Sequence, residues 1–503
     1  MTARESFPGL LLAEWTKLRS VSRWVITLLG AAALTVGLSY LAASGNRQDP
    51  RIQRFYASSP SGQPVSDTFY FVHQPVTGDM TLTVRVASLT LAPSPTGSSS
   101  DDQLTLVDDP SPFAPPAAGI MIKDGTRLGS SYAAVMLTAT RGVRMQWDFD
   151  ADRAGSASTG ARWLRLVRSG DMITGYESAD GADWQQIATA TPSSLPSTVE
   201  VGFYVSSPDA VYSIRGGGGS SREKRGTSAT AAFDSVRLAS ASTSAVAAWH
   251  DEQIGQIGGQ GKGGSGGAMA KAGGTFTVSG TGKVGPNPPE DDMVEIAIVG
   301  VIAGIMALIA VGVLFATSEY RRGMIRTTFT ATPRRGRVLA AKAIVLGGTS
   351  FVLGLVSVVA SFLVAIPVLR RNGFTAPAFP EPSLMDSSVL RAMLLTAAFM
   401  AGVAVVGLGV GMLLRHSAAA ITITIVLVLL PLVVGAILPG SSPKWLMYTT
   451  LAGGLATQRA KPPSIILAQP WALIGPWAGI GVVAAWVALA LGLAWWQLRR
   501  RDA

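Results

Sequence analysis

Long apolar runs alternate with one polar stretch, between residues 44 and 292, along this chain. A helix of about 20 apolar residues can cross a hydrocarbon core of roughly 30 Å. The pattern predicts six such spans, at residues 24–43, 296–317, 343–369, 392–414, 417–438 and 473–496. The chain is therefore predicted to be a six-helix membrane protein with one large polar domain between the first two spans.

The cationic residues predict how the spans are oriented. If the N-terminus is inside, the short inner flanks hold 15 Lys and Arg residues and the two short outer loops hold five. Cytoplasmic loops carry such an excess, so both termini are predicted to be cytoplasmic and residues 44–292 extracytoplasmic. The first apolar run is about twice as long as a signal-peptide core, which favours a retained span.

The polar stretch has the alternation of β-strands. Residues 81–87 alternate polar and apolar side chains, as a strand with one buried face does. Similar runs follow, separated by turn signals such as 169–171, at 119–123, 132–137, 143–147, 163–167, 172–176, 199–205 and 232–238. Many short strands at this spacing predict an all-β sandwich or jelly roll.

Several of these runs resemble the concanavalin- or laminin-G-like sandwich of bacterial surface proteins. The matching segments, in order, are 118–123, 162–170, 175–184, 201–207 and 232–236. The resemblance covers residues 69–238 and is interrupted at 216–226, a Gly-rich insert that we expect to be a flexible loop. Flanking linkers are predicted at 44–68 and at 239–292, the second with a short membrane-proximal strand near 274–280.

Composition excludes several classes of function. The chain has no Cys, and its three histidines, His73, His250 and His416, are far apart in sequence, so no metal site is expected. The net charge is +10, yet residues 44–292 hold 20 basic and 24 acidic residues, a net of −4. The positive excess thus flanks the spans, and no nucleic-acid partner is expected. Abundant Arg, Ala, Gly and Val indicate a GC-rich bacterial source. The chain is therefore expected in a bacterial plasma membrane.

Two features of the polar domain have both a structural and a functional interpretation. Trp147, Trp163 and Trp184 lie in strand patterns, where a role in the core is favoured over a sugar-binding platform. Residues 148–152 have the Asp spacing of a calcium loop, but Arg153 and Thr159 replace the Gly and Glu that the loop requires. A polar turn is therefore predicted there, and neither a metal nor a catalytic residue is assigned.

Two inner segments stand out. In residues 1–23, Leu11, Leu12, Trp15 and Leu18 recur at helical spacing opposite Glu14, Lys17 and Arg19, which predicts an amphipathic helix in the membrane interface. In residues 318–342, a charged helix end meets Gly323, and we expect Pro333 and Gly336 to break the chain before the third span. A solvated basic loop is the alternative for this second segment.

The inner segments resemble those of type-2 ABC transporter permeases. Residues 319–320, 323–326 and 333–335 resemble the segment after the second span of that family. Residues 12–20 resemble the N-terminal helix of its actinobacterial members, and residues 444–448 resemble its outer re-entrant helices, within 439–472. Six spans with both ends inside, the last followed by a tail at 497–503, fit the same family.

This resemblance implies a permease that pairs with a second copy or a paralogue and with cytoplasmic ATPase subunits. ATP and Mg would bind those subunits, since this chain has no Walker motif. No cofactor and no enzymatic role are expected of the chain itself. The resemblance assigns ATPase coupling to Glu319, Tyr320, Arg322, Gly323 and Arg326, and the N-terminal helix to Glu14, Trp15, Lys17 and Leu18.

The sequence leaves two functions open. The first is an exporter of a hydrophobic or amphipathic substrate, because charged residues are absent from the middle of every span. The second is a membrane-anchored sensory or envelope-binding protein whose β-sandwich recognises a glycan or lipid. The lipid bilayer is a partner in both.

Overall fold

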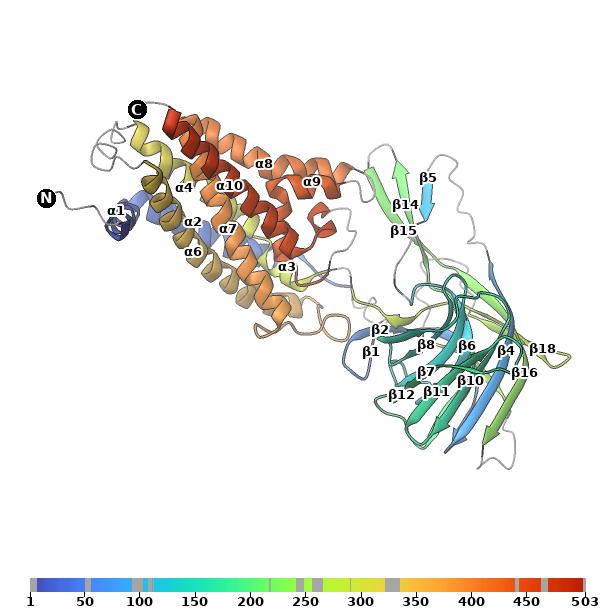
Figure 1. Ribbon diagram of the computed structural model, residues 1–503. Helices are drawn as coiled ribbons and strands as arrows, with labels where there is room; N and C mark the ends of the chain where they lie inside the picture. Colours follow the sequence, from blue (N-terminus) through green and yellow to red (C-terminus); the bar gives the residue numbers. More distant parts are fainter. Residues whose placement is uncertain are drawn as a thin grey trace.

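A computed structural model describes residues 7–49, 56–92, 103–106, 111, 113–216, 219–240, 248–255, 266–289, 291–321, 335–438, 443–462 and 469–500. A helical bundle forms one part of the molecule and a β domain the other (Figure 1). The two parts confirm the predicted fold class, an all-α membrane domain with an inserted two-sheet antiparallel domain.

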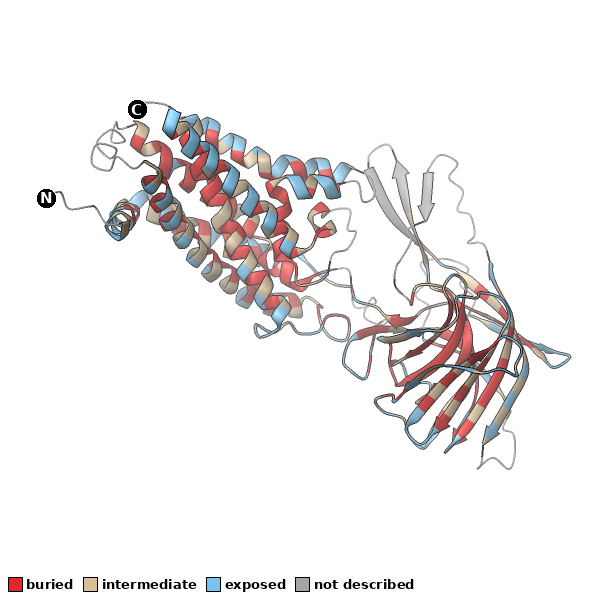
Figure 2. Cartoon of the chain, in the orientation of Figure 1, coloured by how far each residue is buried: buried red, intermediate tan, exposed pale blue. Residues whose placement is uncertain are grey.

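Among the described residues, six helices are long and apolar enough to cross a membrane. They are α2 (Ser22–Gly45), α4 (Val301–Arg321), α6 (Arg335–Arg371), α7 (Ser387–Leu414), α8 (Ser417–Ile437) and α10 (Pro476–Arg500). Helices α4 and α7 are the most buried, and the others have more exposed residues (Figure 2). Many of these exposed residues are large and apolar, such as Leu29, Val352 and Val433. A bundle that exposes such residues is suited to lipid.

The second span is not one continuous helix. A short helix, α3 (Met293–Ile298), precedes α4, and the chain turns between them at Gly300. A Cβ atom at Gly300 would lie 2.0 Å from the carbonyl oxygen of Thr35, and the Gly300 N–H donates to Ser39 Oγ over 3.1 Å. The turn thus presses directly against α2, where only glycine fits.

The third span begins earlier than predicted. Helix α6 starts at Arg335, so Gly336 lies inside a helix and does not break the chain as expected. Arg335 donates to the carbonyl oxygen of Leu498 over 2.9 Å, and Gly336 lies against Trp495. Packing on the end of α10 therefore extends the helix beyond its apolar run.

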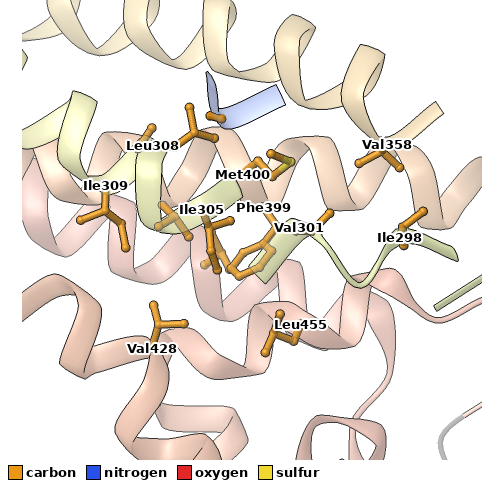
Figure 3. Close-up of a cluster of buried hydrophobic side chains, with 14 of the residues drawn as sticks. Ile298, Val301, Ile305, Leu308, Ile309, Val358, Phe399, Met400, Val428 and Leu455 are labelled. Atoms are coloured by element: carbon orange, nitrogen blue, oxygen red, sulfur yellow. The ribbon is translucent and has the colours of Figure 1, made fainter. Parts of the chain in front are cut away.

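One continuous hydrophobic core fills the interior of the bundle. Figure 3 shows apolar side chains from α3, α4, α6, α7, α8 and the 3-10 helix η2 (Leu451–Gln458) meeting in the interior of the bundle. Glycines let the helices approach closely, since a Cβ atom at Gly312 of α4 would lie 2.1 Å from the carbonyl oxygen of Ala404 of α7. Such close contacts replace the hydrophobic effect as the source of cohesion between helices in lipid.

Short helices lie at both ends of the bundle. Helix α1 (Phe7–Ser20) and the last residues of α10 are at the end away from the β domain (Figure 1). Between α8 and α10, at the other end, lie α9 (Lys444–Thr449), η2 (Leu451–Gln458) and η3 (Pro470–Leu473). Every residue of η2 is buried, so this outer segment is part of the bundle.

The body of the β domain is formed by two seven-stranded antiparallel sheets. The first has the order β12 (Gln185–Ala190), β11 (Met172–Ser178), β10 (Arg162–Ser169), β4 (Met80–Ala92), β16 (Ser228–Ser240), β19 (Thr275–Gly280) and β18 (Ala268–Ala272). The second has the order β17 (His250–Ile254), β3 (Phe69–Thr77), β13 (Thr198–Ser206), β6 (Ala117–Lys123), β7 (Tyr132–Thr138), β8 (Gly142–Trp147) and β9 (Ala151–Ala154). One apolar core lies between them.

The segment predicted as a Gly-rich linker contributes to both sheets. Strand β17 pairs with β3, and β19 pairs with β16 and β18, so the sandwich extends well beyond residue 238. The Gly-rich insert is also more ordered than expected, because β15 (Gly219–Arg225) pairs with β14 (Ala210–Gly216), which pairs with β5 (Gln103–Leu106). Strands can pair through backbone hydrogen bonds alone. The prediction relied on alternating apolar residues, which this insert lacks, and it therefore missed the strand.

A third sheet joins the two ends of the inserted domain. Strand β2 (Pro64–Asp67) pairs with β1 (Ala57–Ser58) and with β20 (Val284–Pro286), which directly precedes the second span. Beneath it, the buried Lys123 Nζ donates to Asp67 Oδ2 over 2.8 Å. The first linker and the end of the second therefore form a paired stalk.

Candidate functional site

Four charged side chains meet at the end of the bundle away from the β domain. Lys342 Nζ, from α6, donates to Glu14 Oε2 over 2.8 Å and to Glu319 Oε1 over 2.7 Å. Lys17 Nζ donates to Glu14 Oε1 over 2.7 Å and to Glu319 Oε1 over 3.2 Å. These four residues, called here the inner charge cluster, join α1 to α4 and α6.

The inner charge cluster is withdrawn from solvent. The side chain of Glu14 is 0% exposed, that of Lys342 1% and that of Glu319 6%, whereas Lys17 is 40% exposed. Lys342 Nζ also lies 4.6 Å from the centroid of the Phe315 ring, a cation–π contact. Buried charges are stable only when paired, so the two lysines and two glutamates hold one another in place.

Lys17 closes the cluster on its exposed side. Burial lowers its pKa, but the Glu14 and Glu319 carboxylates outweigh that effect and raise the pKa above its ordinary value of 10.5. Lys17 is therefore charged at any physiological pH.

The predicted coupling residues lie only partly within the described chain. Glu319 belongs to the inner charge cluster, and the guanidinium of Arg415, at the end of α7, lies 5.0 Å from the centroid of the Tyr320 ring. Arg322, Gly323 and Arg326 lie outside the described residues. The inner charge cluster flanks their segment on both sides, since Glu319 precedes it and Lys342 follows it.

Helix α1 packs on the bundle through one residue from each of its two predicted faces, Glu14 and Leu18. Glu14 and Leu18 are buried, whereas Leu12 and Trp15, predicted to share the apolar face with Leu18, are exposed. The helix rotates in this way because Glu14 finds a partner in Lys342. Leu12 and Trp15 then face the space around the bundle, where lipid tails would cover them.

A second polar cluster, called here the outer cluster after the predicted topology, lies at the end of the bundle nearer the β domain. Arg459, 1% exposed, donates from Nη1 to Glu295 Oε2 and to Gln469 Oε1, both over 3.1 Å. Trp471 Nε1 donates to Glu295 Oε1 over 2.6 Å, and Arg391 Nη2 donates to the carbonyl oxygen of Arg459 over 3.3 Å. Glu295 is thus an ion-pair partner inside the protein and does not reach out to the interface as an edge residue would.

Asp292 ties this outer cluster to the stalk of the β domain. Its Oδ1 caps α3 by accepting from the Val294 N–H, and its Oδ2 accepts from the N–H groups of Ala460 and Lys461 over 2.8 and 3.0 Å. Burial lowers the pKa of Lys461, an effect that Asp292 and Asp291 partly offset. The segment after η2 is therefore fastened to the residues that connect β20 to α3.

The tryptophans of the sandwich serve its structure. Trp147 packs against the core between the sheets. Trp163 of β10 and Trp184 are half-buried beside the β11–β12 turn. A Cβ atom at Gly181 of that turn would lie 2.8 Å from the Trp163 ring, and Trp184 Nε1 donates to the carbonyl oxygen of Gly181. The Arg165 guanidinium lies 3.6 Å from the Trp184 ring centroid. Both indole rings thus already have packing partners within the chain.

The acidic turn at residues 148–152 is held by protein groups. Asp148 Oδ2 accepts from the N–H and hydroxyl of Ser193 over 2.7 and 2.8 Å. Asp152 pairs with Arg144 and accepts from Gln146 Nε2. These contacts fit the predicted polar turn.

Sequence reasoning singled out Glu14, Lys17 and Glu319 but missed Lys342 and the residues of the second cluster. Lys342 counted only as one basic residue of the inner flank, and Arg459 and Asp292 as loop residues. One signal in the sequence could have found part of the inner charge cluster. Glu319 lies at the end of the second apolar run and Lys342, of opposite charge, lies at the start of the third. Pairing across 328 positions, as between Glu14 and Lys342, has no local signal.

Comparison with known proteins does not place the chain in a family. No protein family and no curated protein matches it. Among solved structures, it matches a functionally unknown protein from Saccharomyces cerevisiae at 17% identity, over 37% of this chain and 81% of that one, with a TM-score of 0.19. A likeness at that TM-score carries no argument about fold or function.

Proposed function

We propose that this chain is the membrane subunit of an ATP-binding-cassette exporter, located in a bacterial plasma membrane with both termini cytoplasmic. The inner charge cluster is the observation that carries the proposal. It joins the N-terminal helix to the two helices on either side of residues 322–334, the segment that resembles the coupling loop of type-2 ABC permeases.

The inner charge cluster supplies a means of transmitting force. A partner ATPase that displaced residues 322–334 would pull on the end of α4 and the start of α6, which both contribute to the cluster. Because Glu14 and Lys17 are paired with Glu319 and Lys342, α1 would follow them. Three helices would then move together, and separating them would leave buried charges unpaired.

The chemistry of the membrane domain favours an apolar or amphipathic cargo. The spans carry charged residues only near their ends, so a path between them would offer no charge to a hydrophilic ion. ATP and Mg would bind the ATPase subunits, and a second copy of this chain or a paralogue would complete the transporter. Extracytoplasmic residues 44–292 would then place the sandwich at the exit of that path.

The test is to purify the tagged full-length chain from its own host in mild detergent and to measure the ATPase activity that co-purifies. The double variant Arg322→Glu/Arg326→Glu reverses the charge of the proposed contact without touching the inner charge cluster. The matched control is Lys444→Glu on α9, at the opposite end of the bundle. We expect the co-purified ATPase to fall at least about tenfold in the double variant and to persist in the control.

Two results would contradict the proposal. One is a pure chain with no ATP-hydrolysing partner. The other is an ATPase that remains bound equally well to both variants, since the contact would then lie elsewhere. Retention of envelope glycan or lipid by the wild-type chain, without any ATPase, would instead support a membrane-anchored binding protein.

A further inference from the structure

Folding brings two of the three histidines of the chain onto neighbouring strands. His73 of β3 and His250 of β17 are directly opposite in the antiparallel register, so their side chains leave the same face of the sheet. Glu252, two residues after His250, shares that face, and its Oε1 lies 3.3 Å from His73 Nε2. Glu200 of β13 contacts the other ring nitrogen of His73.

Glu200 and Phe71 fix the imidazole of His73. His73 Nδ1 lies 2.6 Å from Glu200 Oε2, a hydrogen bond in which the carboxylate can only accept. The ring stacks on Phe71 with a centroid distance of 4.6 Å and an interplanar angle of 15°. In the neutral imidazole, a proton on Nδ1 leaves the Nε2 lone pair facing Glu252.

The atoms around Nε2 form an incomplete arrangement. His73 is 7% exposed, and its buried Nε2 has no hydrogen-bond partner. In the tautomer that carries its proton on Nδ1, the Nε2 lone pair faces Glu252 Oε1 at 3.3 Å. Two ligands of a tetrahedral ion, each about 2.0–2.1 Å from the metal, lie roughly 3.3 Å apart, which is the separation seen here.

We propose that this face of the sandwich binds a divalent transition metal of the Zn²⁺ class, with His73 Nε2, the Glu252 carboxylate and the His250 imidazole as ligands. Glu200 would act as a positioning residue, since a carboxylate on the second nitrogen of a ligating histidine sets its tautomer and orientation. Imidazole and carboxylate ligands suit Zn²⁺, Cu²⁺ and Ni²⁺.

His250 is the ligand that must move. Among the described residues, no three His, Asp or Glu side chains already form a group able to hold an ion. His250 is exposed on the edge strand, and the side chain of Glu252 is 49% exposed, so both can rotate toward Nε2 without disturbing the core. The fourth position would face solvent, and the site does not depend on the proposed transport function.

The experiment uses the full chain in detergent, stripped with a chelator and titrated with Zn²⁺ by calorimetry and with Co²⁺ by visible absorption. We expect one Zn²⁺ per chain, a tetrahedral Co²⁺ spectrum and a rise in melting temperature on metal addition. His73→Ala and His250→Ala should abolish all three. Glu200→Gln should weaken binding roughly 10–100-fold while the spectrum persists.

His416→Ala is the matched control, because His416 is the remaining histidine and caps α8 in the membrane domain. Loss of binding in this variant, or unchanged binding in His250→Ala, would overturn the site. So would the absence of Zn²⁺ and Co²⁺ binding by the wild-type chain. Without metal, His250→Ala should melt at the same temperature as the wild-type chain. This measurement distinguishes loss of a metal ligand from loss of the fold.

Discussion

Glu14 and Lys342 lie 328 positions apart in the chain, yet Lys342 Nζ donates to Glu14 Oε2 over 2.8 Å, with both side chains almost completely buried. This pair fastens the N-terminal helix to the start of the third span. It also explains why α1 turns an acidic residue toward the bundle and leaves Trp15 exposed.

Replacing Lys342 by Met should destabilise the membrane domain strongly. The change leaves Glu14 and Glu319 buried with only Lys17 as a partner, and breaking a buried pair costs about 3–5 kcal/mol. The measurement is the midpoint of thermal unfolding of the purified chain in detergent. The matched variant Lys17→Met removes the partly exposed lysine and should cost about 1 kcal/mol or less. Equal losses in the two variants would show that burial does not determine the strength of the cluster.

Replacing Asp292 by Ala should loosen the outer segment from the stalk. The change removes the N-cap of α3 and the acceptor for two backbone N–H groups, at about 1 kcal/mol for the cap alone. Hydrogen exchange of the Ala460 and Lys461 amides should accelerate at least about fivefold. Asp291→Asn is the control, because the Asp291 carboxylate accepts from Gln48 and not from these amides. Unchanged exchange in Asp292→Ala would mean that other contacts hold the segment.

Replacing Gly312 by Ala should force α4 and α7 apart. The added Cβ would lie 2.1 Å from the carbonyl oxygen of Ala404, and overpacking of this kind costs about 1–3 kcal/mol. Gly348 on α6 provides the comparison, since nothing lies within 4 Å of a Cβ placed there. Gly348→Ala should leave the unfolding midpoint unchanged or raise it, because Ala favours helix by up to about 1 kcal/mol.

Replacing Asp180 by Ala should weaken the sandwich in a pH-dependent way. Asp180 Oδ1 accepts from the N–H groups of Ala182 and Asp183 and from the Ser178 hydroxyl, which lowers the pKa of this exposed carboxyl from 3.8 to about 2. Because the folded pKa is below the unfolded one, the stabilisation is complete above about pH 4 and is lost as the pH falls through 2. Unfolding midpoints of wild type and variant should therefore differ at pH 7 and converge near pH 2. Asp183→Asn keeps the backbone donor and should follow wild type.

The membrane helices could be predicted from sequence because a span is a local feature. About 20 consecutive apolar residues are sufficient signal, and all six predicted spans lie within or overlap helices of the structure. The strands of the sandwich could also be predicted where one face of the strand is buried, as in residues 81–87 within β4. Edge strands such as β17 and β15 were missed because their pairing relies on backbone groups that every sequence has.

The sequence by itself determined the six spans, the β-rich insertion between the first two of them and the excess of basic residues on the inner flanks. Only the tertiary structure decided which charges meet. Glu14, Glu319 and Lys342 come together because an ionised group cannot stay in an apolar interior without a partner. In the same way, the register of β17 on β3 makes neighbours of His73 and His250, which lie far apart along the chain. The sequence shows which residue types are present, but contacts between residues that are distant along the chain form only when the protein folds.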